Sequence, residues 1–323
     1  MIFSIIIPAY NVADYIKKAV ESCINQVNIA VDDYEIIVID DGSNDQTGKI
    51  IDEYVNLPNI RIIHQSNRGL SCTRNRGMEL AKGDFIIYLD GDDWLRYDAL
   101  QLLKQYTYDS DLIVFPMNYW YSSDKYEVKS YGLSDGIMTA NEFLSETIGK
   151  QKLNIIPAQC KCYRSNILKT HSQQFIEGIL HEDNPYFIDT VLNFRRIKYI
   201  DDGIYFYRQN RAGSITSSQT LKNFDGTIIG IKHAISRFGF KNRNINYLMT
   251  CWHTFQVLLN YNDEADKKNV VIKYYRQPRI KWQIIRMLTN STFVPKQIVR
   301  TILLLIDPMV LTKFGDILYG KRR

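Results

Sequence analysis

Residues 34–43 are Tyr34-Glu35-Ile36-Ile37-Val38-Ile39-Asp40-Asp41-Gly42-Ser43, an apolar, β-branched run that ends in acidic and turn-forming residues. Such a run predicts a strand buried on both faces. The first 117 residues hold five such runs, at 3–8, 34–40, 60–63, 84–89 and 111–115, with helical spacing at about 12–26, 45–55, 69–81 and 97–105. The alternation predicts an α/β fold with a mostly parallel, Rossmann-like sheet and helices on both faces.

The rest of the chain divides into two further parts. Residues 118–216 are less regular: we expect a hairpin or loop at 120–131, a helix that starts with a capping box at Thr139 and Glu142, and a hairpin that pairs 196–200 with 204–207. From about residue 220 the pattern is helical. We therefore expect an α/β domain at 1–216, with halves at about 1–117 and 118–216, and a helical region at 217–323.

The charge of the chain is unevenly distributed. The 323 residues carry a net charge of +5, but residues 267–323 hold 13 Lys and Arg against 2 Asp and Glu. Residues 1–266 keep 27 basic and 33 acidic residues, a balance of −6. This division argues against a generally basic, nucleic-acid-binding protein.

Cysteine usage and apolar runs bear on the cellular compartment. The five cysteines are sparse, odd in number and lack paired C-x-x-C motifs, which favours a reducing cytoplasm. The longest apolar runs are far shorter than a bilayer span, so we expect no transmembrane helix. The N-terminal residues lack the pattern of a secretory signal.

Polar residues follow three of the expected strands. Pro8-Ala9-Tyr10-Asn11 ends the first strand, Asp40 and Asp41 end the second, and Asp90-Gly91-Asp92-Asp93-Trp94 ends the strand at 84–89. Ligands of parallel α/β sheets bind beyond the carboxyl ends of the strands. We therefore expect these groups to meet at one edge of the sheet.

Each acidic group has a chemical and a structural interpretation. Asp90 and Asp92 face the same side of an extended chain, and paired carboxylates suit Mg²⁺ or Mn²⁺, but the same residues also suit a turn that caps a helix after Trp94. Asp40 could accept an N–H group of a nucleobase such as uracil, although Asp and Ser are also ordinary residues of a strand-to-helix turn. Both interpretations stay open at this point.

Two further stretches hold charged residues near expected helix starts. Arg68, Arg74 and Arg76 flank a helix N-terminus, where arginines could meet a pyrophosphate or form a solvated basic face; Arg74 is the better candidate for an inward role. In His181-Glu182-Asp183-Asn184-Pro185, Pro185 suits the first helical position. A carboxylate there would stay ionised near the helix N-terminus and could act as a general base, or simply cap the helix.

Five motifs occur in order: Ile6-Ile7-Pro8-Ala9-Tyr10-Asn11, residues 38–47, residues 65–71 with Arg74-Asn75, residues 83–94, and His181-Glu182-Asp183. Together they resemble the family-2 inverting glycosyltransferases of the GT-A fold, of the bacterial type that builds capsular, exopolysaccharide or lipopolysaccharide glycans. The resemblance covers about residues 1–215. It implies transfer of one sugar from a UDP-sugar to a hydroxyl of a glycan or lipid-linked glycan acceptor, with a divalent metal, Mn²⁺ or Mg²⁺.

The resemblance also implies residue roles. Asp183 would be the catalytic base, Asp92 with Asp90 would hold the metal, and Asp90 would also face the ribose. The nucleotide would contact the residues Pro8, Ala9, Tyr10, Asn11, Asp40, Asp41 and Arg74. Arg208, Arg211, Glu182 and Trp94 are candidates for contacts with the diphosphate or the acceptor.

This sequence departs from the family pattern at two places. Gly91 stands where Ser is common, and the 205–215 region has no His that could add a metal ligand. The Q-x-x-R-W motif of processive synthases is absent, which favours a single transfer per encounter. Two alternative functions remain. A sugar-nucleotide nucleotidyltransferase would need a Gly- and Arg-rich phosphate loop after the first strand, and residues 8–12 do not have this composition. The other alternative is a catalytically inactive protein of the same fold that binds nucleotide sugars.

The basic tail at 267–323 mixes Lys and Arg with Trp, Ile and Leu, as in Lys281-Trp282-Gln283-Ile284-Ile285-Arg286. Such helices can lie on an anionic membrane surface. They can equally pack on the α/β body or form a homodimer. We expect the protein in the cytoplasm. The basic tail adds the hypothesis that it attaches peripherally to the inner face of the cell membrane.

Overall fold

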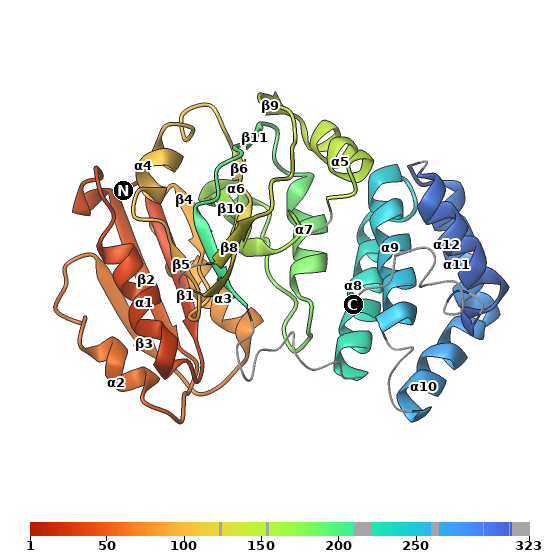
Figure 1. Cartoon of the computed structure of the whole chain (residues 1–323), viewed down its shortest axis with the longest axis horizontal. Helices are drawn as coiled ribbons and strands as arrows, with labels where there is room; N and C mark the ends of the chain where they lie inside the picture. The colour runs from red at the N-terminus through yellow and green to blue at the C-terminus, as the bar shows by residue number, and fades with distance from the viewer. Residues whose placement is uncertain are drawn as a thin grey trace. The chain divides into compact units, whose positions relative to one another are not determined.

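The computed structural model describes residues 1–122, 125–152, 155–209, 221–259, 265–292, 294–309 and 311 (Figure 1). Contacts divide the chain into two compact units. The first comprises residues 1–178 and 189–212, and the second comprises residues 179–188 and 213–323. The second unit thus takes a short segment from within the predicted α/β region.

An eight-stranded sheet forms the body of the first unit, in the order β3-β2-β1-β4-β10-β6-β11-β9. Only β9 and β10 of this sheet run against the other strands. The strands are β1 (Phe3–Ala9), β2 (Tyr34–Asp40), β3 (Ile60–His64), β4 (Phe85–Tyr88), β6 (Leu112–Val114), β9 (Ile137–Met138), β10 (Lys161–Arg164) and β11 (Ile197–Tyr199). The five strands expected in the first 117 residues are confirmed.

Helices cover both faces of this sheet. Strand β1 carries apolar side chains on each face, and burying both sets requires a helix on either side. Ile5 and Ile7 share a core with Ile16 of α1, whereas Ile6 meets α3 at Gly77, where an added Cβ would overlap the Ile6 side chain. The helices of this unit are α1 (Ala13–Ile24), α2 (Thr47–Asp52), α3 (Leu70–Leu80), α4 (Ala99–Lys104), α5 (Ala140–Gly149) and α6 (Ser165–Thr170), with 3-10 turns η1 (Val31–Asp33) and η3 (Ala158–Cys160). The capping box at the start of α5 is confirmed.

A second, four-stranded sheet has the order β5-β12-β7-β8. Its strands are β5 (Trp94–Leu95), β7 (Met117–Ser122), β8 (Lys125–Val128) and β12 (Tyr205–Arg208). The predicted hairpin at 120–131 is confirmed by the antiparallel pair of β7 and β8. The predicted hairpin between 196–200 and 204–207 is wrong: β11 pairs in parallel with β6, and β12 pairs in parallel with β7. Residues 200–204 carry the chain from one sheet to the other, so neither strand is opposite its sequence neighbour.

The second unit is helical, as expected from residue 220 onward. It contains α8 (Leu221–Phe238), α9 (Arg243–Leu259), α10 (Ala265–Arg276), α11 (Pro278–Thr289) and α12 (Pro295–Ile306). Helix α9 packs against the other four. The division between the units falls within α7 (Asp183–Val191). No helix among the described residues has the length and apolar character needed to cross a membrane. All five cysteines are buried free thiols.

Candidate active site

The carboxyl ends of β1, β2 and β4 lie side by side, and the loops that follow them touch. Ala9 pairs with Asp40 across the sheet, and the backbone N–H of Asp41 donates to the carbonyl oxygen of Ala9 at 2.8 Å. A Cβ atom added to Gly91 would lie 3.1 Å from the carbonyl oxygen of Pro8. These loops, residues 8–11, 40–45 and 89–93, are called the rim below, and the sequence prediction that they converge is confirmed.

Asn11 ties two of these loops together. Its backbone N–H donates to the Ser43 hydroxyl oxygen at 3.0 Å, and its side-chain oxygen accepts the backbone N–H of Asn44 at 2.8 Å. Asn11 has a φ of 49°, in the left-handed region that Asn tolerates better than most residues. The neighbouring Tyr10 is 45% exposed. The rim therefore presents the Tyr10 ring on a backbone that Asn11 fixes.

Asp40 is buried at the end of β2 and is bound on both oxygens. Oδ1 accepts the backbone N–H of Ser43 at 3.0 Å, and Oδ2 lies 3.0 Å from Nδ1 of His64. Nε2 of His64 lies 2.9 Å from Oδ1 of Asp52. The hydrogen bonds to Asp40, and then to Asp52, raise the pKa of His64 above its ordinary value. His64, which no sequence motif identified, thus bridges Asp40 and Asp52.

Asp41 organises the loop between β3 and α3. Its Oδ1 accepts hydrogen bonds from Gln65 Nε2 at 2.6 Å and from the backbone N–H of Arg68 at 2.9 Å, and its Oδ2 accepts the backbone N–H of Gly69 at 2.7 Å. Gly42 has a φ of +74°, and a Cβ there would lie 2.7 Å from the Asn67 nitrogen. The Asp-Gly pair is therefore needed for the backbone path of this loop.

Asp90 is held by two side chains from distant parts of the chain. Its Oδ1 accepts a hydrogen bond from Nη2 of Arg74 at 2.8 Å, and its Oδ2 accepts one from Nε2 of Gln159 at 2.5 Å. Arg74 is fully buried in α3, and its guanidinium lies 5.2 Å from the centre of the Phe175 ring. The inward position predicted for Arg74 is confirmed, whereas Gln159 had no motif that could have identified it.

Gln159 is placed by a buried ammonium group. Lys161 is fully buried, and its Nζ donates to the carbonyl oxygens of Ile155 at 2.5 Å and Pro157 at 2.6 Å. A buried ammonium surrounded by carbonyl oxygens fixes the backbone that supplies them. Lys161 therefore holds the turn that carries Gln159 to Asp90.

The residues after Asp90 do not cap a helix, because β5 follows them and α4 begins only at Ala99. Asp93 is buried and accepts hydrogen bonds from the Tyr205 hydroxyl at 2.6 Å and from the backbone N–H of Arg208 at 2.8 Å. Burial raises the pKa of Asp93 well above its usual range, and the charges of Asp92 and Asp90 add to this. Asp92 itself is half-buried. Asp93 thus anchors the rim to β12.

Arg208 binds the backbone of Asp92, and Arg208 and Lys18 both stand close to the rings of two tryptophans. The Arg208 guanidinium donates from Nε to the backbone oxygen of Asp92 at 3.0 Å and lies 5.0 Å from the Trp94 ring centre and 4.8 Å from that of Trp120. Nζ of Lys18 lies 3.2 Å from the Trp94 centre. Burial, and then the charge of Arg208, lower the pKa of Lys18. This arrangement holds positive charge beside the acidic rim.

The remaining predicted residues do not belong to the first unit as the structure describes it. Asp183 is the first residue of α7, so Pro185 is the third helical residue and not the first as predicted. Glu182 is buried, and His181 has a φ of 62° and a pKa that burial lowers. These residues belong to the second unit. Arg211 lies outside the described residues. Within the described part of the chain, no group of three His, Cys, Asp or Glu side chains could hold a metal ion.

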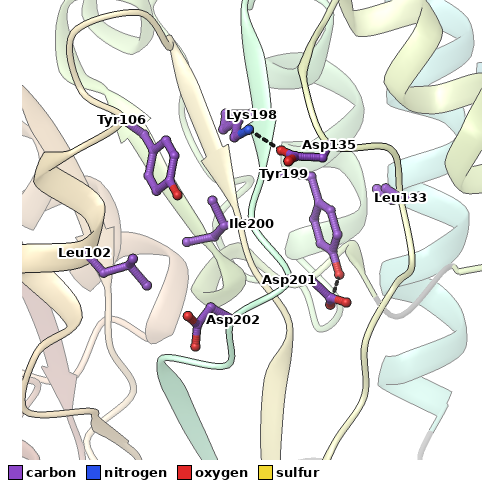
Figure 2. A pocket seen from close by; sticks show the side chains of 9 residues that line it. All are labelled: Leu102, Tyr106, Leu133, Asp135, Lys198, Tyr199, Ile200, Asp201 and Asp202. Atoms are coloured by element: carbon purple, nitrogen blue, oxygen red, sulfur yellow. Dashed lines mark hydrogen bonds and ion pairs between the residues drawn. The ribbon is translucent and has the colours of Figure 1, made fainter.

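A pocket of about 270 Å³ lies in the first unit, and Figure 2 shows its lining. It is lined by Leu102, Tyr106, Leu133, Asp135, Lys198, Tyr199, Ile200, Asp201 and Asp202. Asp135 pairs with Lys198 at 2.5 Å, and Asp201 accepts a hydrogen bond from the Tyr199 hydroxyl. None of the predicted site residues lines this pocket, so it is separate from the rim.

Comparison with known proteins identifies the family. The profile described as "Glycosyl transferase family 2" matches residues 4–171, slightly more than half of the chain. The chain belongs to glycosyl transferase family 2. The match includes the whole rim and both side chains that hold Asp90.

Individual relatives of this family-2 chain support the same assignment. It is 31% identical over 212 residues to "Uncharacterized glycosyltransferase EpsJ" of Bacillus subtilis (strain 168). The aligned region covers 64% of this chain and 61% of that protein. It is 29% identical over 234 residues to "Uncharacterized glycosyltransferase YibD" of Escherichia coli (strain K12), with coverage of 69% and 66%. The match therefore spans less than two thirds of the length of either relative.

Solved structures show the fold. The crystal structure of S. aureus TarS 1–349 in complex with UDP-GlcNAc superimposes with a TM-score of 0.74 over 98% of this chain and 92% of that chain, at 18% identity. The likeness confirms the predicted GT-A fold with a helical C-terminal region.

Proposed function

We propose that this chain is an inverting glycosyltransferase that moves one sugar from a UDP-sugar to a hydroxyl of a glycan or lipid-linked glycan during the synthesis of bacterial surface polysaccharide. One observation carries the proposal: in a family-2 sheet, Asp90 is fixed by Arg74 and Gln159 beside the half-buried Asp92. The names of the relatives, which include glycosyltransferases and a protein solved with UDP-GlcNAc, support it. Family membership favours this function over the nucleotidyltransferase and scaffold alternatives.

The donor nucleotide is proposed to bind along the rim. Pro8, Ala9, Tyr10 and Asn11 would line one side of the base. Asp40 and Asp41 would face the uracil; a carboxylate oxygen has two lone pairs, so an oxygen that takes one hydrogen bond within the chain can accept another. Asp90 would face the ribose, with Arg74 holding its orientation.

The side chains at the rim fit a divalent metal. Mg²⁺ and Mn²⁺ bind hard oxygen ligands, commonly one or two carboxylates together with substrate phosphates. Asp92 is proposed as the main protein ligand and Asp90 as the second, because both belong to one short loop and an Asp90 oxygen that accepts one hydrogen bond keeps a second lone pair for a metal. When bound, Mn²⁺ or Mg²⁺ would neutralise charge on the leaving diphosphate.

Arg208 is proposed to act on the same diphosphate. Its Nε is bound to the backbone of Asp92 and its guanidinium is held between aromatic rings, so the side chain is ordered before any ligand arrives. Arg211 is proposed as a second contact. Trp94 and Glu182, both buried, are proposed on the acceptor side.

Asp183 is proposed as the general base. In an inverting transfer the acceptor hydroxyl attacks the anomeric carbon on the face opposite to the departing UDP, so a single carboxylate that takes the hydroxyl proton is sufficient. Asp183 starts α7, where the helix dipole favours a negative charge. No enzyme nucleophile is needed.

The two regions of the chain are proposed to have different roles. Residues 1–216 would carry out catalysis, and residues 217–323 would attach the enzyme to its surroundings from the cytoplasm. The anionic inner face of the cell membrane and a second copy of the chain compete as partners of this region.

The base is tested by the Asp183→Asn variant. We expect it to lose transfer while UDP binding, measured by calorimetry, stays near that of the wild type, because Asp183 is proposed to act only on the acceptor. Asp225→Asn changes an exposed acid of the same unit and should leave both unchanged. Wild-type turnover in Asp183→Asn would remove this residue from the mechanism.

A further inference from the structure

Helix α11 has a buried side and an exposed side. Its buried residues are Ile280, Ile284 and Met287, which recur with helical spacing. Trp282, which is 62% exposed, and Ile285 lie on the opposite side. Successive residues of a helix turn by about 100°, so positions two apart, such as 282 and 284, point in nearly opposite directions. The core of the second unit therefore accounts for only half of the apolar side chains of α11.

Helix α12 repeats this arrangement. Gln297, Thr301 and Leu304 are buried, and Gln297 donates a hydrogen bond to Thr254 of α9 at 3.1 Å. Val299, Ile302 and Ile306 recur at the same helical spacing on the other side of α12. They are 47%, 44% and 61% exposed, respectively. An apolar stripe thus lies on the side of α12 that is turned away from α9.

The two exposed stripes belong to one surface. Helices α11 and α12 pack against each other and both pack against α9, so the sides turned away from α9 point the same way (Figure 1). Nζ of Lys281 donates to the carbonyl oxygen of Ile306 at 3.2 Å, which places the start of α11 next to the end of α12. We call this surface, formed by Trp282, Ile285, Val299, Ile302 and Ile306, the outer face.

Within the two helices that form the outer face, the charges have one sign; Asp307, just after α12, is paired with Arg276 of α10. Helices α11 and α12 carry five basic residues and no acidic residue. Arg279, Arg286 and Lys296 are exposed. A basic helix pair with exposed Trp, Ile and Val matches an anionic lipid surface, where apolar side chains enter the acyl boundary and cations meet the headgroups. A second copy of the same face would instead bring like charges together.

We propose that the outer face docks on a bilayer surface that contains anionic lipids. Trp282 and the apolar stripe of α12 enter the interface, and the flanking cations bind the phosphates of the headgroups. Docking would hold the catalytic unit near lipid-linked acceptors, but the docking itself requires neither donor nor acceptor. Its failure is therefore distinguishable from failure of the proposed transfer.

The test is sedimentation of the full chain with vesicles of phosphatidylcholine alone or with about one third phosphatidylglycerol. We expect binding to the anionic vesicles that weakens with salt, because each cation near the surface contributes about fivefold to the partition constant and is screened by ions. Arg279→Gln combined with Lys296→Gln should lower the constant about 30-fold. Ile302→Ser combined with Ile306→Ser should abolish binding. Ile229→Ser alters an Ile of α8 with 42% exposure and should bind like the wild type.

Three outcomes would overturn the proposal. The first is a wild-type chain that sediments with neither kind of vesicle. The second is binding that the Ile302→Ser/Ile306→Ser variant retains, which would place the contact elsewhere on the chain. The third is a wild-type dimer in light scattering that this variant converts to a monomer, which would make the outer face a contact between copies. The melting temperature of each variant checks that it is folded.

Discussion

Replacing Gln159 with Leu removes one of the two donors that hold Asp90. Nε2 of Gln159 lies 2.5 Å from Oδ2 of Asp90, and Arg74 occupies the other oxygen at 2.8 Å. A hydrogen bond to a charged group contributes about 1.5–3 kcal/mol. The Asp90 side chain is 23% exposed, so water can replace part of the loss and the lower end applies. We therefore expect Gln159→Leu to reduce the free energy that holds the Asp90 side chain in its orientation by about 1.5 kcal/mol.

The assay separates binding from chemistry. A cost of about 1.4 kcal/mol corresponds to tenfold in affinity, so the KM for the UDP-sugar should rise about tenfold in Gln159→Leu while kcat changes little. Gln159→Glu has almost the same shape but brings a carboxylate toward Asp90, and its KM should rise further. Gln105→Leu alters an exposed glutamine at the end of α4 and serves as the control.

Two results for Gln159→Leu would contradict a role of Gln159 in positioning Asp90. If Gln159→Leu binds UDP and turns over donor like the wild type, the hydrogen bond to Asp90 does not position the donor site. If instead the melting temperature collapses and binding is lost only together with folding, Gln159 serves stability and not the orientation of Asp90. The Gln159→Glu variant, which keeps the side-chain volume, distinguishes these two results.

Three further predictions concern Asp93 and Gly42 of the rim and His64, which contacts it. Asp93→Ala should lower the free energy of unfolding by about 2–4 kcal/mol, because the Tyr205 hydroxyl and the backbone N–H of Arg208 lose their buried acceptor. Asp93→Asn should lower it less. The difference in stability between Asp93→Asn and the wild type should also shift in favour of the variant as the pH rises, because the raised pKa of Asp93 makes its ionisation unfavourable in the folded chain. Wild-type stability that is unchanged in Asp93→Ala would contradict this. His64→Gln should lower the melting temperature at pH 6 but much less at pH 9. The pKa of His64 is higher in the folded than in the unfolded chain, so protonation stabilises the fold at pH values below the unfolded-state pKa, and this stabilisation is lost as the pH rises through the folded-state pKa. An equal shift of the melting temperature at both pH values would show that the charge of His64 contributes nothing. Gly42→Ala should reduce both the melting temperature and the affinity for UDP, because φ is +74° and the added Cβ meets the loop after β3 at 2.7 Å; a wild-type melting curve would refute the strain.

The sequence was sufficient to predict the five strands of the main sheet that lie in the first 117 residues, because each is a short apolar run next to a helical segment; β9 and β10 were not predicted. Local patterns could not predict the path of residues 196–208. An Asp-Asp-Gly segment between two apolar runs is typical of a hairpin, but β11 and β12 instead extend two different sheets. The choice depends on long-range pairing with β6 and β7, which no local motif encodes.

The candidate site shows the same limit. The acidic residues of the rim were predictable because they follow strands, but the groups that hold them come from far along the chain. Gln159 and Tyr205 lie 69 and 112 residues from the carboxylates that they bind. Neither residue type is characteristic of a site when read alone. Sequence patterns thus predicted the charged groups, whereas the structure was needed to find their partners.

Release of UDP tests most directly whether a UDP-sugar is the donor that binds at the rim. The wild-type chain and Asp92→Asn are incubated with a panel of UDP-sugars and Mn²⁺ or Mg²⁺. We predict that the wild type releases UDP from at least one sugar nucleotide, and that removal of the metal or the Asp92→Asn change abolishes release. A folded wild-type chain that neither binds nor cleaves any UDP-sugar would contradict the account.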